Sequence, residues 1–245
     1  MQYPMNDNWF FTPCYSDDLR QAKPDSLPNT LEVVRIPHTT TMLQANYSPE
    51  EDYRQESAYL HILTPPAAWR GRRVQLRFGA AAHQAEVFLN GVSLYTHSCG
   101  YTAFTVDLTD HLRFEGKNLI LVRVDSRETL NIPPFGKAID YMTFGGLYRE
   151  VTLEVRGPAM LENVFVNGSA DGVFSVSSEA VDADGCTLRV RVTDDHGAEL
   201  WKTEQPFVPS LTVSLPNAPL WSTDAPRLCT ARLELWRDNR LMDEQ

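Results

Sequence analysis

A hairpin signal centred on Asn90-Gly91 is the feature that most constrains the fold of this chain. Apolar and polar residues alternate on both sides of the pair within residues 85–97, AEVFLNGVSLYTH. Asn-Gly supplies the positive φ angles of a type I′ turn, whose twist matches that of the two flanking strands. Residues 85–97 therefore predict a β-hairpin.

Short segments with strand character recur along the rest of the chain, separated by turn-forming residues. Because no amphipathic helix of useful length interrupts them, they predict an all-β fold made of β-sandwiches. The predicted strands are residues 31–36, 57–63, 73–78, 104–108, 118–124, 147–155, 160–166, 173–178, 187–193, 198–202, 211–215 and 228–236. Residues 1–30 lack a sustained period, so we expect an irregular segment whose aromatic residues 9–11 pack on the first core.

Gly157-Pro158 marks the predicted boundary between two domains. We expect a first domain at residues 1–157 and a smaller one at residues 158–245. The second contains Asp-His-Gly and Asp-Asn turns between short strands, which suits an immunoglobulin-like sandwich. A chain of 245 residues is long enough to form two such domains.

Residues 139–155, IDYMTFGGLYREVTLEV, join a loop to one of the predicted strands. Paired glycines allow positive φ and close backbone approach, so Gly145-Gly146 predict a sharp turn just before the strand. On residue types alone, the simplest role for Asp140 is to hold backbone amides of this turn or to pair with Arg149.

The net charge of −10 and the hydropathy pattern argue against several classes of binding partner. No basic patch is interleaved with aromatic residues, which argues against nucleic acid and anionic membranes as partners. No apolar run approaches the ~20 residues that a membrane span needs. The N-terminus lacks the basic region and apolar run of a secretory signal, so the expected location is cytoplasmic.

The four cysteines are widely scattered, and no cysteine–histidine cluster predicts a metal site or a cofactor. Cys186, Trp201 and Cys229 follow the cysteine–tryptophan–cysteine order of an immunoglobulin domain. A tyrosine corner would place Tyr two residues before the second cysteine, but that residue is Arg227. We therefore expect four free thiols and no metal.

Two long segments, residues 39–56 and 126–146, lack a strand pattern and are candidates for function because of their length. No nucleophile elbow, phosphate-binding glycine loop or zinc-protease motif is present. His38 follows a proline, and its expected role is a hydrogen bond within a loop. The residues by themselves favour a non-catalytic binding or scaffolding role.

Four segments in order resemble the N-terminal part of glycoside hydrolase family 2, which includes β-galactosidases, β-glucuronidases and β-mannosidases. They are RIPHTT (35–40), AYLHILTPPAAWRGRRVQLRFGAAAHQAEVFLNG (58–91), HSCGYTAFTVDLTDHLRFEGKNLILVRVD (97–125) and IDYMTFGGLYREVTLEV (139–155). A weaker resemblance continues in PNAPLWSTDAPRLCTARLELW (216–236). The LHIL strand and the Ser-Cys-Gly segment depart from the family pattern, but these departures put no functional residue in doubt.

The resemblance implies a jelly-roll sugar-binding domain followed by the immunoglobulin-like domain. In the family a (β/α)₈ barrel then carries both catalytic carboxylates, and β-glycosides are hydrolysed with retention. The chain stops at Gln245, where that barrel would begin. We therefore expect a non-catalytic N-terminal portion of a retaining β-glycosidase, by preference a β-galactosidase. Its partners would be a β-linked sugar and the barrel of the same polypeptide, and homo-oligomerisation is left open.

The resemblance also implies two sugar contacts. In the family, a jelly-roll loop reaches over the barrel and lends an acidic residue to the sugar subsite. That residue lies nine positions before the arginine of the Gly-Leu-Tyr-Arg motif, which is Asp140 here. Asn46 corresponds more loosely to a second sugar contact, and Arg149 is interpreted as structural. The alternatives are a free-standing carbohydrate-binding module and a purely structural interaction domain.

Overall fold

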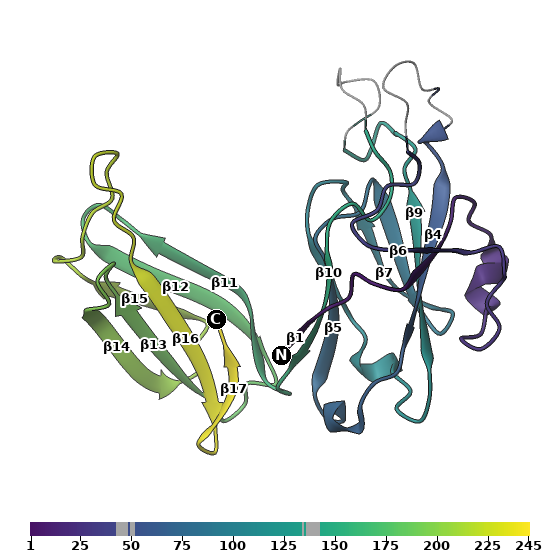
Figure 1. The fold of residues 1–245 in the computed structure, drawn as a ribbon. Helices are drawn as coiled ribbons and strands as arrows, with labels where there is room; N and C mark the ends of the chain where they lie inside the picture. Colours follow the sequence, from purple (N-terminus) through teal and green to yellow (C-terminus); the bar gives the residue numbers. More distant parts are fainter. Residues whose placement is uncertain (43–48, 50–51, 134, 136–142) are drawn as a thin grey trace. The chain divides into compact units, whose positions relative to one another are not determined.

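The computed structural model describes residues 1–42, 49, 52–133, 135 and 143–245. The chain divides into two compact units, Met1–Val155 and Arg156–Gln245 (Figure 1). In the described residues twelve strand pairs are antiparallel, and helical structure is confined to short 3₁₀ turns, among them η1 (Asp17–Gln21), η3 (Ala67–Trp69) and η4 (Thr109–His111). None of these described turns has the length and apolarity that crossing a bilayer requires. The all-β prediction is confirmed.

The first unit is a sandwich of two sheets (Figure 1). The strand order is β3-β2-β4-β9-β6-β7 in the six-stranded sheet and β1-β10-β5-β8 in the four-stranded sheet. The strands are β1 (Gln2–Pro4), β2 (Trp9–Thr12), β3 (Glu32–Val34), β4 (Glu56–Leu63), β5 (Arg73–Phe78), β6 (Gln84–Leu89), β7 (Val92–Ser98), β8 (Phe104–Asp107), β9 (Asn118–Asp125) and β10 (Val151–Arg156).

The core of this unit lies between the two sheets because alternate residues of each strand point inward. Tyr59 of β4, Ile120 of β9 and Leu153 of β10 are fully buried in it. The expected anchoring by the N-terminal aromatic residues is confirmed for Trp9 and Phe11, which join the same core.

The expectation of an irregular segment at residues 1–30 was wrong for β1 and β2, whereas residues 13–30 contain no strand. β1 pairs with β10, and β2 pairs with β3 and β4. β1 has three residues and β2 has four. So short a strand shows no usable period in the sequence, and distant partners determine it.

The predicted hairpin is confirmed as β6 and β7. Asn90 and Gly91 have φ of 53° and 85°, as a type I′ turn requires. A Cβ on Gly91 would lie 2.6 Å from the carbonyl oxygen of Arg20, so close packing excludes a larger residue there as well.

The second unit is a smaller sandwich with strand orders β11-β12-β15 and β14-β13-β16-β17 (Figure 1). The strands are β11 (Met160–Gly168), β12 (Val173–Val181), β13 (Thr187–Thr193), β14 (Glu199–Pro206), β15 (Ser210–Ser214), β16 (Thr230–Arg237) and β17 (Arg240–Glu244). The first sheet joins strands one, two and five of this unit, as in an immunoglobulin domain. Only β17 was not predicted.

The cysteine prediction is confirmed because all four thiols are free. Cys186 is buried in the core of the second unit, whereas Cys229 is exposed. Arg227, in the position that a tyrosine corner would use, pairs with Asp195 instead.

Candidate functional site

The two long segments, residues 39–56 and 126–146, meet the strands at one end of the six-stranded sheet. β4 begins at Glu56, where the first segment ends, and β9 ends at Asp125, where the second begins. Glu56 and Asp125 are direct cross-strand partners. Both predicted sugar contacts, Asn46 and Asp140, lie outside the described residues.

The Gly145-Gly146 turn lies at the base of this end. The backbone N–H of Thr40 donates to Gly145 O at 3.1 Å, and Gly146 forms a two-bond bridge with Ala82. Gly146 has φ of 110°, as paired glycines allow, and a Cβ there would lie 2.5 Å from Tyr59 Oη. A Cβ on Gly145 would lie 2.5 Å from the Cβ of Ser126. Both positions therefore require glycine.

The strand predicted at residues 147–155 begins only at Val151. His38 N–H donates to Leu147 O, and Gly79 N–H donates to Glu150 O, each at 2.8 Å. Residues 147–150 are thus held by separate partners and not by one neighbouring strand. Leu147 and Val151 are nevertheless both fully buried.

Ser126 ties the two segments together at their strand ends. Its hydroxyl lies 2.7 Å from Tyr53 O and 2.9 Å from Gln55 O, and accepts from Gln55 N–H at 3.0 Å. Its own N–H donates to Gln55 O at 3.0 Å. Ser126 is only 1% exposed, so these bonds satisfy a buried polar side chain.

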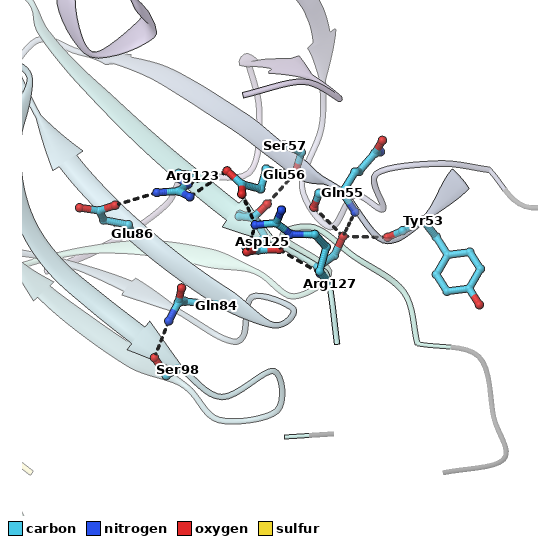
Figure 2. Close-up of polar contacts among 12 residues, drawn as sticks. Tyr53, Gln55, Glu56, Ser57, Gln84, Glu86, Ser98, Arg123, Asp125 and Arg127 are labelled. Carbon is cyan, nitrogen blue, oxygen red and sulfur yellow. Dashed lines mark hydrogen bonds and ion pairs between the residues drawn. The ribbon is translucent and has the colours of Figure 1, made fainter. Parts of the chain in front are cut away.

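A network of charges surrounds this junction (Figure 2). Arg123 binds the carboxylate of Glu56 through Nε at 3.0 Å and Nη2 at 2.8 Å, and it approaches Glu86 at 3.6 Å. Arg127 bridges Glu56 and Asp125. Burial raises the pKa of Asp125, but the hydrogen bonds and charge of Arg127 outweigh it and hold that pKa below its usual value. The network therefore favours the ionised form of Asp125, and its ion pairs join the ends of β4 and β9.

Two histidines pack behind the turn. Nδ1 of His38 lies 3.0 Å from Tyr59 Oη, which confirms His38 as a hydrogen-bonding loop residue. Burial lowers the pKa of His38, and a smaller effect of Glu32 opposes it. His83 is 3% exposed, and burial lowers its pKa against the opposing charges of Glu128 and Asp125. Lowered pKa values favour neutral rings at neutral pH, so neither histidine supplies a positive charge there.

A pocket of about 330 Å³ lies beside the turn. It is lined by Thr39, Ala82, His83, Gly100, Tyr101, Thr143, Phe144, Tyr148 and Arg149. The guanidinium of Arg149 stacks on Tyr148, 5.6 Å from the ring centroid. Arg149 is exposed at this pocket, and its structural role stays a prediction. Larger surface hollows occur in the second unit, but they contain neither predicted contact.

Metal ligation has no support in the described part of the chain, where no group of three or more histidine, cysteine or carboxylate residues is placed to hold an ion.

No protein-family model matches the chain. A β-galactosidase of Thermoanaerobacter pseudethanolicus is 30% identical over 97% of this chain and 33% of its own length. A β-galactosidase of Thermoanaerobacterium thermosulfurigenes is 29% identical over 98% of the chain and 36% of its own length. The chain is homologous to the N-terminal part of glycoside hydrolase family 2 enzymes. It spans about a third of the length of these relatives.

A solved β-glucuronidase structure has the same fold. Bacteroides uniformis β-glucuronidase 2 superposes on the whole chain with a TM-score of 0.84 at 22% identity, and 32% of that protein is covered. Similarity at this identity supports the fold and nothing further.

The residues that join the two segments, Ser126 among them, were not predicted. Ser126 follows β9 in a polar run, VDSRETL, that matches no motif. The nearest signal was the Gly145-Gly146 pair, which indicated close approach but not the group approached.

Proposed function

We propose that these residues form the non-catalytic N-terminal part of a retaining β-glycosidase, by preference a β-galactosidase. The observation that carries this is the alignment of almost the whole chain with two β-galactosidases. The catalytic carboxylates would belong to a barrel domain of the same polypeptide, and the substrate would be a β-linked sugar.

Within this function, Asp140 is the proposed sugar contact of the first unit. An ionised carboxylate suits this role because its hydrogen bonds to hydroxyl groups are stronger than those of a neutral acceptor. The simpler role, holding the Gly145-Gly146 turn, has less support because Thr40 and Ala82 already bind the backbone of that turn. Asn46 is the proposed second contact.

Asp140→Ala tests the assignment. In the full-length polypeptide we expect kcat/KM for an aryl β-galactoside to fall about ten- to a hundredfold, since a hydrogen bond to a charged group is worth about 1.5–3 kcal/mol. The Tm of the 245-residue chain should change little. The matched control is Asp110→Ala, because Asp110 is an exposed acid in η4 of the same unit. If the 245-residue chain loses several degrees while the full-length enzyme keeps its kcat/KM, Asp140 is a turn residue.

The 245 residues alone should hydrolyse no aryl β-glycoside and bind monosaccharides weakly, because the sugar subsite is shared between domains. Turnover that survives removal of contaminating enzyme would contradict the non-catalytic role. Micromolar binding of a monosaccharide, measured by titration calorimetry, would favour a free-standing carbohydrate-binding module.

A further inference from the structure

Three side chains meet where the two long segments return to the sandwich. Arg54 follows Asn46 in the first segment, whereas Glu128 and Thr143 flank Asp140 in the second. Arg54 Nη2 lies 2.8 Å from Glu128 Oε1, and Thr143 Oγ1 donates to the same oxygen at 2.9 Å. One carboxylate oxygen thus contacts both segments and both sides of the second one.

The burial of these groups separates them from an ordinary surface ion pair. The side chain of Glu128 is 5% exposed and that of Arg54 is 19% exposed, whereas Arg35 and Asp7 pair at 74% and 69% exposure. Thr143 is also buried. A buried charge is strongly disfavoured without its partner, so the contact holds the two segments at one separation.

Other hydrogen bonds beside the contact join the segments at single points. The backbone N–H of Thr40 donates to Gly145 O, which joins the first segment to the residues after Asp140. Thr41 Oγ1 donates to Asp52 O at 2.7 Å, which joins the first segment to itself. Ser126 joins the first segment only to the start of the second. Of these contacts, only the one through Glu128 joins the first segment to residues on both sides of Asp140.

We propose that Glu128 is a positioning residue: with Arg54 and Thr143 it forms a clamp that fixes the two segments carrying Asn46 and Asp140 relative to each other. This rests on the proposed function for its effect on sugar, but the clamp itself is a property of the first unit. Glu128 touches no substrate; it acts through the placement of the two contacts.

The first experiment measures the clamp without reference to activity. Glu128→Gln in the 245-residue chain keeps an acceptor for Thr143 and nearly the same volume, but it removes the charge that binds Arg54. Charge-assisted hydrogen bonds are about twice as strong as neutral ones, so we expect amide hydrogen exchange at residues 52–55 and 143–146 to accelerate about tenfold. Exchange in β5 and β9 should not change.

The matched control is Asp107→Asn. Asp107 pairs with Arg73 at 3.1 Å in the same unit, and the asparagine keeps the acceptor for Thr109 N–H. This variant should leave exchange at residues 52–55 and 143–146 unchanged. If Glu128→Gln also leaves it unchanged, the clamp does not hold these segments and the proposal is overturned.

The second experiment tests the effect on sugar with Glu128→Gln, Asp140→Ala and the double variant in the full-length enzyme. A small misplacement of a binding group costs up to roughly a hundredfold. Glu128→Gln should raise KM about tenfold with kcat within about twofold, the signature of lost uniform binding. Combined with Asp140→Ala it should add much less than it does alone, since only the Asn46 contact remains to be positioned.

Two substitutions of Thr143 test whether its hydroxyl group is required. Thr143→Ser keeps the hydroxyl and should keep the wild-type KM, whereas Thr143→Val should raise it. If the effects of Glu128→Gln and Asp140→Ala simply multiply, the clamp does not act through Asp140 and the proposal is overturned. If Asp140→Ala leaves kcat/KM unchanged, the assignment of Asp140 as a sugar contact fails, and hydrogen exchange still decides whether the clamp exists.

Discussion

The two units share an all-β architecture but bury very different amounts of apolar surface. The core of the first unit contains 24 buried residues among those described, including the large aromatic residues Trp9 and Phe78. The core of the second contains eight, and neither β14 nor β15 has a buried residue. Hydrophobic stabilisation grows with the apolar area removed from water, so the first unit has the larger driving force for folding.

The first unit uses that driving force to bury polar groups. In the described residues, Ser178 is the only buried polar or charged residue of the second unit, whereas the first unit has eight. Three of the eight, Thr40, Ser126 and Thr143, lie where the two long segments join the sandwich. A large core offsets the cost of such groups, and the comparison shows why the candidate site belongs to the first unit.

Of the changes considered, Gly146→Ala should lower the stability of the first unit most strongly. The new Cβ would lie 2.5 Å from Tyr59 Oη at a φ of 110°, so strain and a clash with the core combine. We expect the first unit to lose about 3 kcal/mol or more of unfolding free energy, measured by hydrogen exchange of β4 and β9 during a urea titration.

The matched control for that variant is Gly116→Ala. A Cβ at Gly116 would have no atom within 4 Å, and its φ is not positive. The expected change is within about 0.5 kcal/mol. Equal effects of the two substitutions would show that the turn does not depend on close packing.

Cys186→Ser tests how well the small core of the second unit tolerates a polar group. Cys186 is 3% exposed in its small core, and a hydroxyl there costs about 1–3 kcal/mol without a hydrogen-bond partner. Cys229→Ser, at an exposed thiol, should change the unfolding free energy by less than about 0.5 kcal/mol. Chemical denaturation of the three proteins measures both values, and similar losses would mean that the second core tolerates polar groups.

Mild acid should have the smallest effect of these changes. It should lower the unfolding free energy of the first unit and leave that of the second nearly unchanged. Burial lowers the folded-state pKa of His38, His61, His83 and His97, all of which belong to the first unit. Below the ordinary value of 6.5 the unfolded chain binds more protons than the folded unit, so stability falls as pH falls. For one buried histidine such as His83, the unfolding free energy can fall by at most about 1.4 kcal/mol per pH unit.

The measurement is hydrogen exchange of each unit between pH 7.5 and 5.5, corrected for the intrinsic rate. The only histidine of the second unit, His196, is exposed. The first unit should therefore lose stability over this range while the second stays nearly constant. Equal losses in the two units would contradict the assignment to buried histidines.

Local patterns in the sequence were sufficient for most of the strands and for the turns between them. The alternation in β5 and β13 predicted both strands with the bounds that the structure has. Asn90-Gly91 predicted the hairpin because positive φ is a property of the residues in the turn itself. The missing immunoglobulin disulfide followed from Arg227 in the same local way.

Contacts between distant residues were decided only by the tertiary structure. β1 and β2 are strands because β10 and β4 pair with them, about 150 and 50 residues further along the chain. Gly145-Gly146 indicated a close approach, but only the fold brings Ser126 and Tyr59 to that turn. The contact among Arg54, Glu128 and Thr143 likewise could not be predicted from the spacing of these residues in the sequence. Its free energy comes from burying three separate polar groups together.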